Sequence, residues 1–417
     1  MARKVMGRTV TAIDIGTTKI VVIIAHINAQ GYTEVVGIGQ YPSYGLRKGV
    51  IVNIGQTVES IKAAVHEAQT MAGTMVESAC VGISGGHIQS FNSTGVVAIK
   101  SKEVTQDDID RVIEAAKAIP LPKDQYILHV LPQYFRVDGQ EYVFDSLGMY
   151  GVRLEAQVHI ITGAVASAQN IIKSCELAGV RVSDIVLEQL ASAAAVLTPA
   201  EQEMGVGILD IGGGTSDFAI YKDGRIRHSK VLPIAGNHFS NDIAIGLGIP
   251  FGKAEELKKR FGSVIFDTMH LQSPNVEVDL DYEGGSKMVS LSTMTEIVGF
   301  RAEEVFDLFL EEINHFRLRA LMPCGLVLTG GGSLLAGIKE LASDKLGMPV
   351  RIGLPESPHK DALSGIPDIL KSPIYATAYG LLVNASGERS MGDISSDDAA
   401  LFGRVLKRMK SWIYDLF

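Results

Sequence analysis

The feature that most constrains this 417-residue chain is a run of small and polar residues at its centre. The run Asp210–Asp217 reads Asp-Ile-Gly-Gly-Gly-Thr-Ser-Asp and follows the apolar residues Gly205–Leu209. An apolar run that leads into consecutive glycines is typical of a buried strand ending in a tight turn, whose backbone N–H groups can approach an anion closely. The candidate phosphate-binding residues of this turn are Gly212, Gly213, Gly214 and Thr215. The alternative is a glycine hairpin without a ligand, because Asp-Gly pairs are ordinary turn formers.

A second copy of this pattern lies near the start of the chain. A predicted strand over 9–13 leads into Asp-Ile-Gly-Thr-Thr-Lys, and an aliphatic strand over 20–25 follows. Asp14 and Asp210 end their strands about half the chain apart, and a carboxylate there can hold a hydrated Mg²⁺. The residues of the first turn that we expect to contact phosphate are Gly16, Thr17, Thr18 and Lys19. Two matched hairpins indicate a duplicated fold that clamps a ligand between its halves, with two unrelated hairpins as the alternative.

A third apolar run, Gly325–Leu328, leads into another glycine turn. The residues of this turn are Thr329, Gly330, Gly331, Gly332 and Ser333. We expect Ser333 to cap a helix over 334–346. A glycine turn at a helix N-terminus admits a flat or anionic ligand group closely, so this turn is a third candidate for ligand contact.

One glutamate is a candidate for catalysis. Glu188 stands where a short predicted strand over 185–187 meets an alanine-rich helix. From that position a carboxylate could place a water molecule against a phosphate. A solvated or cap-bonded glutamate is equally consistent with the sequence.

The chain is too long for one simple core, so we expect several subdomains. Residues 84–162 have a glycine-rich start, short alternating strands and a helix capped by Thr105. We interpret them as an inserted subdomain, although more of the same core is the alternative. The other predicted subdomains are a first core unit (1–83, 163–198 and 376–384), a second core unit (199–236 and 310–375) and a smaller second-half unit (237–309).

The end of the chain has a different composition. Residues 385–400 are polar, acidic and aperiodic, which predicts a flexible linker, and residues 401–417 carry an apolar stripe at helical spacing beside four basic side chains. We expect a membrane-binding set of Phe402, Arg404, Val405, Leu406, Lys407, Arg408, Met409, Lys410, Trp412, Ile413, Leu416 and Phe417. The linker, the local positive charge and the terminal position favour an amphipathic helix at the surface of an anionic membrane over a helix packed on the protein's own core.

Composition limits the compartment and the partners. The three cysteines are far apart and lack CxxC spacing, so we expect no disulfide or zinc site and infer a reducing cytoplasm. A net charge of −9, with an acidic body and a basic end, argues against general nucleic-acid binding. The apolar run Ile20–Ile27 is short of the ~20 residues of a membrane span, and we expect no signal peptide.

The three turns, in this order and spacing, are similar to the two phosphate loops and the adenosine loop of the actin-like ATPase superfamily, which includes actin, sugar kinases, heat-shock chaperone ATPases and MreB. The resemblance implies an α/β fold of two duplicated ribonuclease H-like halves that binds ATP and Mg²⁺, with Asp14 and Asp210 facing the metal through water. Glu255 and Lys258 match a Glu-x-x-Lys pair that meets the ribose and adenine side in several relatives. Glu188 matches the catalytic carboxylate of the chaperone and MreB branches. Gln189 follows it where those branches often have proline, which weakens the assignment of hydrolysis, and we expect at most weak ATPase activity.

Within this superfamily the whole chain resembles the FtsA family of bacterial cell-division proteins. The resemblance is carried by residues 83–88 (Ile-Ser-Gly-Gly-His-Ile), 128–133 (Leu-His-Val-Leu-Pro-Gln) and 156–161 (Ala-Gln-Val-His-Ile-Ile), and by the acidic linker with its basic helix. It implies an FtsA-type (1C) inserted subdomain, head-to-tail polymerisation, and binding of the C-terminal peptide of the tubulin-like protein FtsZ through the smaller second-half subdomain. It further implies a peripheral protein that tethers the FtsZ ring to the cytoplasmic face of the cell membrane at midcell and helps recruit other division proteins.

Two other functions use the same fold. A small-molecule kinase of the sugar-kinase type needs an acceptor pocket with a general base, and it usually lacks a membrane helix. Another actin-like scaffold, such as MreB or a pilus-assembly ATPase, is disfavoured by the terminal amphipathic helix and by residues 84–162. We expect the chaperone branch to be excluded, because no substrate-binding domain follows residue 384.

Overall fold

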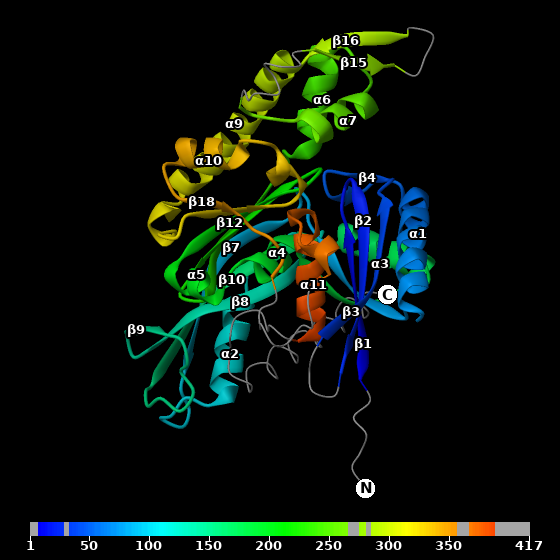
Figure 1. The fold of residues 1–417 in the computed structure, drawn as a ribbon. Helices are drawn as coiled ribbons and strands as arrows, with labels where there is room; N and C mark the ends of the chain where they lie inside the picture. Colours follow the sequence, from blue (N-terminus) through cyan, green and yellow to red (C-terminus); the bar gives the residue numbers. More distant parts are fainter. Residues whose placement is uncertain (1–6, 29–32, 266–274, 281–284, 357–366, 388–417) are drawn as a thin grey trace.

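The computed structural model describes residues 7–28, 33–265, 275–280, 285–356 and 367–387. Figure 1 shows two α/β halves that meet around a pair of central helices, with one further subdomain at each end of the molecule. The predicted amphipathic helix over 401–417, and the linker from residue 388 onward, lie outside the described residues. Within the described ranges, no helix has both the length and the apolar character needed to cross a membrane.

The first half is built on a five-stranded sheet in the order β11-β6-β1-β2-β3. These strands span Arg181–Leu187 (β11), Ser78–Ile83 (β6), Arg8–Ile15 (β1), Lys19–Ile27 (β2) and Thr33–Pro42 (β3). The pairs β1/β2 and β2/β3 are antiparallel, whereas β6 is parallel to both β1 and β11. The sheet is accompanied by helices α1 (Ile54–Ala72) and α3 (Val165–Leu177) and by the short hairpin β4 (Leu46–Arg47) and β5 (Val50–Ile51).

The second half repeats this sheet strand for strand, in the order β14-β13-β12-β17-β18. The strands span Arg225–Leu232 (β14), Ser216–Lys222 (β13), Val206–Ile211 (β12), Leu326–Thr329 (β17) and Val350–Ile352 (β18). The pairs β14/β13 and β13/β12 are again antiparallel, and β17 is again parallel to both β12 and β18. The same order and directions in both halves confirm the predicted duplication.

Two helices, α4 (Glu188–Val196) and α11 (Ala376–Ser386), join the halves. Helix α11 packs on the first sheet, α4 packs on the second sheet, and the two helices pack on each other. A Cβ at Gly380 of α11 would lie 1.8 Å from the carbonyl oxygen of Ala191 in α4. Only glycine allows the two backbones to lie this close together.

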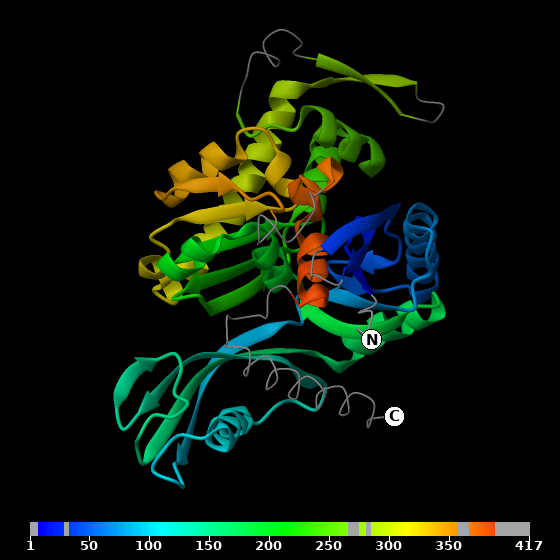
Figure 2. The same cartoon turned by 60° about the horizontal axis from the view of Figure 1, so that its bottom comes forward.

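The inserted subdomain is a four-stranded sheet in the order β7-β10-β8-β9 with helix α2 packed against it. Its elements span Gln89–Ala98 (β7), Gln106–Lys117 (α2), Gln125–Val137 (β8), Gln140–Val143 (β9) and Arg153–Ala164 (β10). Helix α2 begins with a capping box between Thr105 and Asp108, as its sequence predicts. In Figure 2 this subdomain projects away from both halves and has its own layer of sheet and helix.

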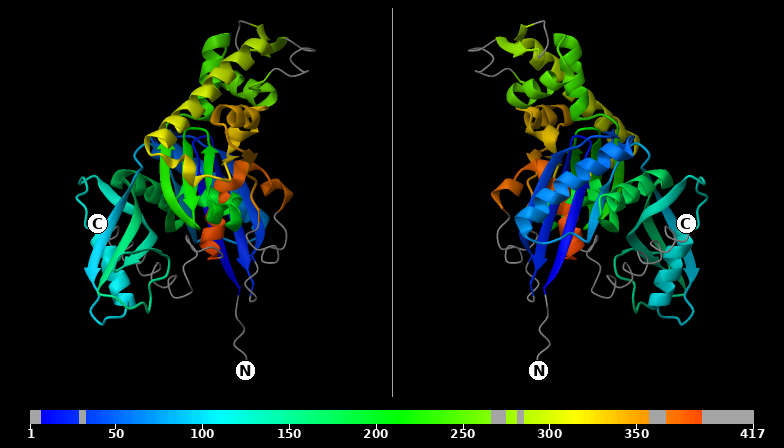
Figure 3. Two further views of the ribbon diagram at one scale, coloured as in Figure 1. Left: turned by 90° about the vertical axis from the view of Figure 1, so that its left-hand side faces the viewer. Right: turned by 90° about the vertical axis from the view of Figure 1, so that its right-hand side faces the viewer.

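The smaller second-half subdomain lies at the opposite end of the molecule from the insert (Figure 3). It comprises α6 (Gly236–Leu247), α7 (Phe251–Phe261), the hairpin β15 (Asn275–Asp279) and β16 (Ser286–Ser290), and the first part of α9 (Leu291–His315). It shares one continuous apolar core with the second sheet, through residues such as Phe239, Phe306 and Phe309. Among the described residues, the second half also contains α5 (Pro199–Met204) and α10 (Ile338–Leu346).

Three predicted helix boundaries are wrong. The predicted cap at Ser333 fails because that residue belongs to a 3₁₀ turn over Gly331–Leu334, where its hydroxyl donates to Gly330 O, and α10 begins only after Gly337. The apolar spacing of residues 57–72 predicts a helix that begins at Thr57, but α1 begins three residues earlier, because the side chain of Asn53 accepts from the Gln56 amide. Helix α11 continues to Ser386, two residues into the predicted linker.

Candidate functional site

The turns of the two hairpins touch each other between the halves. A Cβ at Gly213 would lie 2.4 Å from Thr18 Cγ2, and a Cβ at Gly214 would lie 2.4 Å from Thr17 Oγ1. The glycines of one turn are therefore required by the threonines of the other. The structure thus brings the predicted phosphate-binding turns into direct contact.

The second turn rests on the start of α6. The carbonyl oxygen of Gly212 accepts from the Gly236 amide at 2.9 Å, and that of Gly213 accepts from the Asn237 amide at 2.7 Å. Within the turn, the Gly212 amide donates to Thr215 O at 3.0 Å. These bonds fix the carbonyl oxygens of the turn toward α6 and hold the glycines in one conformation.

The predicted pair Glu255 and Lys258 is joined to the same turn. Lys258 Nζ donates to Glu255 at 2.7 Å, to Ser240 Oγ at 2.8 Å and to Gly236 O at 2.9 Å. The Gly236 amide also donates to Gly212 O, so Gly236 links the ion pair on α7 to the glycine turn.

The third glycine turn packs on the second. A Cβ at Gly330 would lie 2.2 Å from Asp210 Oδ1, and a Cβ at Gly332 would lie 2.3 Å from Ile211 Cγ2. Gly330 also has a φ of +80°, a backbone angle that residues with a side chain rarely adopt. All three predicted loops therefore meet around Asp210.

Three buried aspartates, Asp14, Asp210 and Asp217, lie at the strand ends of the two hairpins. Asp210 accepts from the hydroxyls of Ser192 and Thr377, the second at 3.0 Å. Asp217 accepts from Ser84 at 2.7 Å and from Thr215 at 3.1 Å. Each carboxylate of the second hairpin is thus positioned by two hydroxyls from different elements.

Glu188, the first residue of α4, lies near the three aspartates. The position that a Cβ would take on Gly82 lies 3.1 Å from Glu188 Cγ, so the strand β6 leaves just enough room for it. The neighbouring Gln189 is fully buried, and neither atom of its amide has a hydrogen-bond partner among the described residues. A buried polar group without a hydrogen-bond partner lowers the stability of the fold by about 1–3 kcal/mol. The Gln189 amide is therefore locally unfavourable for folding.

The carboxyl groups perturb one another. Burial, together with the nearby Asp210, raises the pKa of Asp14 to about 6 against the lowering effect of Lys19. Burial, reinforced by Asp210 and Asp14, raises the pKa of Asp217 to about 7. Burial, with the same aspartates, also raises the pKa of Glu188 well above its usual range. A concentration of negative charge this large favours binding of a cation.

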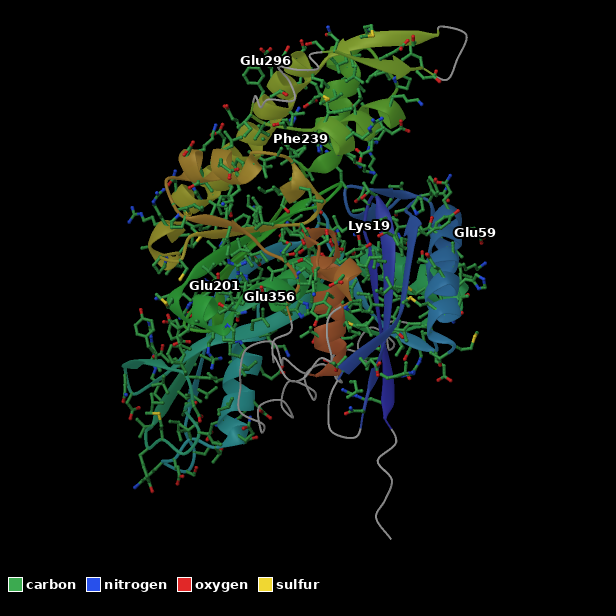
Figure 4. The ribbon with its side chains drawn as sticks, in the orientation of Figure 1. Lys19, Glu59, Glu201, Phe239, Glu296 and Glu356 are labelled. Carbon is green, nitrogen blue, oxygen red and sulfur yellow. The ribbon has the colours of Figure 1, made fainter. Side chains whose placement is uncertain are left out.

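Lys19 is the nearest fixed positive charge that this hairpin provides. Its side chain is labelled in Figure 4. Its Nζ lies 3.9 Å from Asp14, donates to Ile374 O at 2.6 Å and lies 5.6 Å from the centre of the Tyr375 ring. The remaining carboxylates and hydroxyls are hard oxygen donors of the kind that Mg²⁺ prefers. In the described part of the chain, no three His, Cys, Asp or Glu side chains are arranged to hold a metal ion directly.

Four residues of this cluster were not predicted as site residues: Ser84, Ser192, Asp217 and Thr377. Ser84 directly follows β6, so its position at a strand end was a usable signal. Asp217 lies in the central run itself, two residues after Thr215. Ser192 and Thr377 are internal to helices, and only the packing of α4 on α11 brings them to Asp210.

Solved structures with the same fold define the class of protein. A structure of the PilM-PilN type IV pilus biogenesis complex matches with a TM-score of 0.66 at 16% identity, covering 92% of this chain and 99% of that one. MreB5 of Spiroplasma citri bound to ADP matches with a TM-score of 0.51 at 17% identity, covering 89% and 94%. A MamK double helical filament matches with a TM-score of 0.50 at 14% identity, covering 92% and 99%. The fold is that of an actin-like protein, as predicted.

Sequence comparison gives the family. The model described as cell division protein FtsA matches residues 207–380, and the model described as SHS2 domain inserted in FTSA matches residues 85–162. Cell division protein FtsA of Pseudomonas aeruginosa is 44% identical over 423 residues, covering 100% of both chains. That of Neisseria meningitidis is 40% identical over 417 residues, covering 98% of this chain and 99% of the relative. The chain therefore belongs to the FtsA family of cell-division proteins, which confirms the resemblance and the FtsA-type insert.

Proposed function

We propose that the site binds ATP with Mg²⁺ between the two hairpins. The observation that carries this proposal is the group of buried carboxylates at the ends of matching strands, whose pKa values are raised by burial and by one another. A divalent cation would neutralise this charge. The oxygens of the triphosphate would bind the cation and accept hydrogen bonds from the turns.

The individual roles follow from position. Asp14 and Asp210 would hold the hydrated ion, and Mg²⁺ when bound would screen the phosphate charge. The hydroxyls of Thr17 and Thr18 and the second turn would bind the phosphate oxygens. Glu255 and Lys258, joined to that turn through Gly236, would face the ribose and adenine side.

Glu188 is poorly suited to strong base catalysis in this arrangement. Burial and the neighbouring aspartates raise its pKa well above the usual range, which reduces the fraction of ionised carboxylate that can accept a proton from water. We therefore propose at most weak ATP hydrolysis, with the bound nucleotide serving mainly to set the relative position of the halves.

Nucleotide binding is tested by titrating the full-length chain with a fluorescent ATP analogue, with Mg²⁺ or with EDTA. We expect saturable binding that weakens by about tenfold or more when the cation is removed. Binding that is equally tight in EDTA would contradict the metal role, and no binding in either condition would contradict the nucleotide site.

We further propose that the chain self-associates head to tail and tethers the FtsZ ring to the cytoplasmic face of the membrane at midcell, where it recruits other division proteins. Support comes from the family and from the sequence of residues 401–417, which places four basic residues beside an apolar stripe. Each basic residue near anionic lipid contributes about 1 kcal/mol, so one tail binds reversibly. A polymer that presents many tails binds far more tightly through effective concentration.

This role is tested by sedimenting the full-length chain with anionic liposomes and a synthetic FtsZ C-terminal peptide, with and without ATP. We expect the peptide to pellet only when both protein and liposomes are present, and the yield to rise with ATP. Trp412→Glu should release the protein from the liposomes and leave ATP binding unchanged, whereas Trp412→Phe is the matched control. Failure of the peptide to bind in any condition would remove the tether role.

A further inference from the structure

Strand β8 of the insert contacts both halves of the molecule. Its segment 128–133 contributes Leu128 and Leu131 to the core that the first half shares with the second, while Val130 lies in the insert's own core. Adjacent residues of a strand face opposite sides, so Leu131 lies on the side of β8 that packs on the halves and Val130 on the side that builds the insert. This segment is thus a shared structural element of three units.

Two β-bulges bound this segment. The pairing of β8 with β10 passes over Leu128 at one end and Gln133 at the other, and residues between them pair in regular register. A bulge redirects the side chain of the extra residue, and proline is tolerated in a strand near a bulge. The bulge at Gln133 therefore changes which side of β8 faces the halves: Leu131 and Gln133 contact them, whereas Phe135 beyond the bulge lies in the insert's own core.

At one end, His129 holds the first half. Its Nε2 accepts the backbone N–H of Leu187 at 3.1 Å, and Leu187 is the last residue of β11 before Glu188 begins α4. Burial lowers the pKa of His129 to about 4, so the ring is neutral at physiological pH and keeps its accepting nitrogen. The residue before α4 has no side-chain cap of its own, so this bond fixes where the helix starts.

At the other end, Gln133 holds the second half. Its buried Nε2 donates to Ile226 O at 3.0 Å and to Arg227 O at 3.2 Å, both on β14. Strand β14 is the edge of the second sheet, so its outward carbonyl groups have no neighbouring strand in that sheet. Two further bonds from the insert reach Ser229 on the same strand, from Ser90 Oγ at 2.6 Å and from His159 Nε2 at 2.9 Å.

We infer that β8 is a brace between the halves, through which the position of β14 in the second half sets the position of Leu187 and Glu188 in the first. His129 and Gln133 lie four residues apart on one strand, about 13 Å at the usual rise, so the two attachments cannot shift independently. A shift between the halves on nucleotide binding must therefore move Leu187, move the insert, or break buried hydrogen bonds at Gln133. This inference rests on the proposed nucleotide site, and it makes His129 and Gln133 positioning residues for Glu188.

The experiment changes one end of the brace and measures the other. Gln133→Leu keeps the size of the side chain but removes the donor to β14, and hydrogen exchange of the Leu187 amide is then followed in the full-length chain with and without ATP and Mg²⁺. We expect exchange at Leu187 to rise by about tenfold and its response to ATP to fall by at least half, with ATP affinity changed by less than about threefold. The matched control is Ser93→Ala, whose hydroxyl donates to Ala116 O inside the insert, and it should leave Leu187 unchanged.

The outcomes separate the brace from the nucleotide site. If ATP binds and Leu187 exchanges identically in Gln133→Leu and the unchanged chain, the brace is wrong and the proposed function stands. If the unchanged chain binds no ATP, the proposed function is wrong, and so is the part of the inference that couples β8 to nucleotide binding. Should circular dichroism show that Gln133→Leu is unfolded, Ser90→Ala provides the milder test, since it removes a single bond to Ser229 O on the same side.

Discussion

The two halves have the same sheet but supply different chemistry to the site. The first turn presents side chains, with the hydroxyls of Thr17 and Thr18 and the ammonium of Lys19. The second turn presents three glycines, two of which would clash with those threonines if they carried a Cβ. Each turn therefore has the composition that the other requires, and the duplication produced complementary surfaces instead of identical ones.

The residues after equivalent strands differ in the same way. Strand β11 is followed by Glu188, whereas β18, its counterpart in the second sheet, is followed by Gly353, where a Cβ would lie 2.6 Å from Val327 Cγ1. Strand β6 is followed by Ser84, which donates to Asp217, whereas β17 is followed by Gly330, which packs on Asp210. At these equivalent strand ends, the first half thus supplies a polar side chain and the second half a glycine that allows a close contact.

The largest expected effect comes from breaking this complementarity. Gly213→Val would place methyl groups where Thr18 Cγ2 lies, and overpacking of this kind costs about 1–3 kcal/mol, which corresponds to a loss of ATP affinity of about fivefold to 150-fold. The measurement is titration with a fluorescent ATP analogue. Thr18→Gly in the same chain should restore part of the affinity, because it removes the clashing atoms.

The control for this prediction is Gly252→Ala in α7, where a Cβ meets nothing within 4 Å. It should leave ATP affinity unchanged. Equal losses in Gly252→Ala and Gly213→Val, or no recovery in the double variant, would show that the two turns do not fit each other in the way described.

A smaller effect separates the two strand-end aspartates. Asp14 has Lys19 3.9 Å away as a partner, whereas Asp210 is held by the hydroxyls of Ser192 and Thr377. Removing either charge should weaken Mg²⁺-dependent ATP binding by about tenfold. Asp14→Asn also leaves Lys19 without its carboxylate partner, so its remaining affinity should depend more steeply on salt than that of Asp210→Asn. Identical salt dependence in the two variants would argue against separate roles.

The pH dependence of stability provides a third, smaller test. A carboxyl whose folded pKa exceeds its unfolded value destabilises the folded state once it ionises, so its contribution is fully present below about pH 4 and is lost as pH rises through the folded value. For Asp217 that value is about 7. In EDTA and without nucleotide, Asp217→Asn should therefore gain about 2–4 °C in melting temperature relative to the unchanged chain between pH 4 and pH 7.

The buried histidines act in the opposite direction, because burial lowers the pKa of His129 to about 4 and of His159 to about 3. Their contribution to stability rises with pH over the same range. The difference between Asp217→Asn and the unchanged chain removes this shared background. A difference that stays constant from pH 4 to pH 7 would mean that Asp217 titrates normally.

The sequence predicted the duplication and the three turns because each is a local pattern of an apolar strand followed by glycine or hydroxyl residues. It did not predict the contacts of Ser84 with Asp217 or of Ser192 with Asp210, since these join residues that only the packing of separate elements brings together. The predicted cap at Ser333 was wrong because the preceding glycines allow a 3₁₀ turn over Gly331–Leu334. The chain then passes through Gly337, with a φ of +79°, before α10 begins. The membrane-binding set at 402–417 stays a prediction.

The smallest expected effect concerns Glu188, the carboxyl group that the second half lacks. Because burial shifts Glu188 toward its protonated form, Glu188→Gln, which introduces a neutral amide of nearly the same shape, should perturb the site little. ATP affinity should change by less than about threefold, and the slow hydrolysis of ATP by at most about tenfold, well below the 10²–10⁴-fold that a general base contributes. Phosphate release in single-turnover reactions measures this, with Glu59→Gln on the exposed face of α1 as the control. A loss of hydrolysis beyond about a hundredfold would mean that Glu188 is ionised and acts as a base when nucleotide is bound, and the site would then be an efficient ATPase instead of a positional switch.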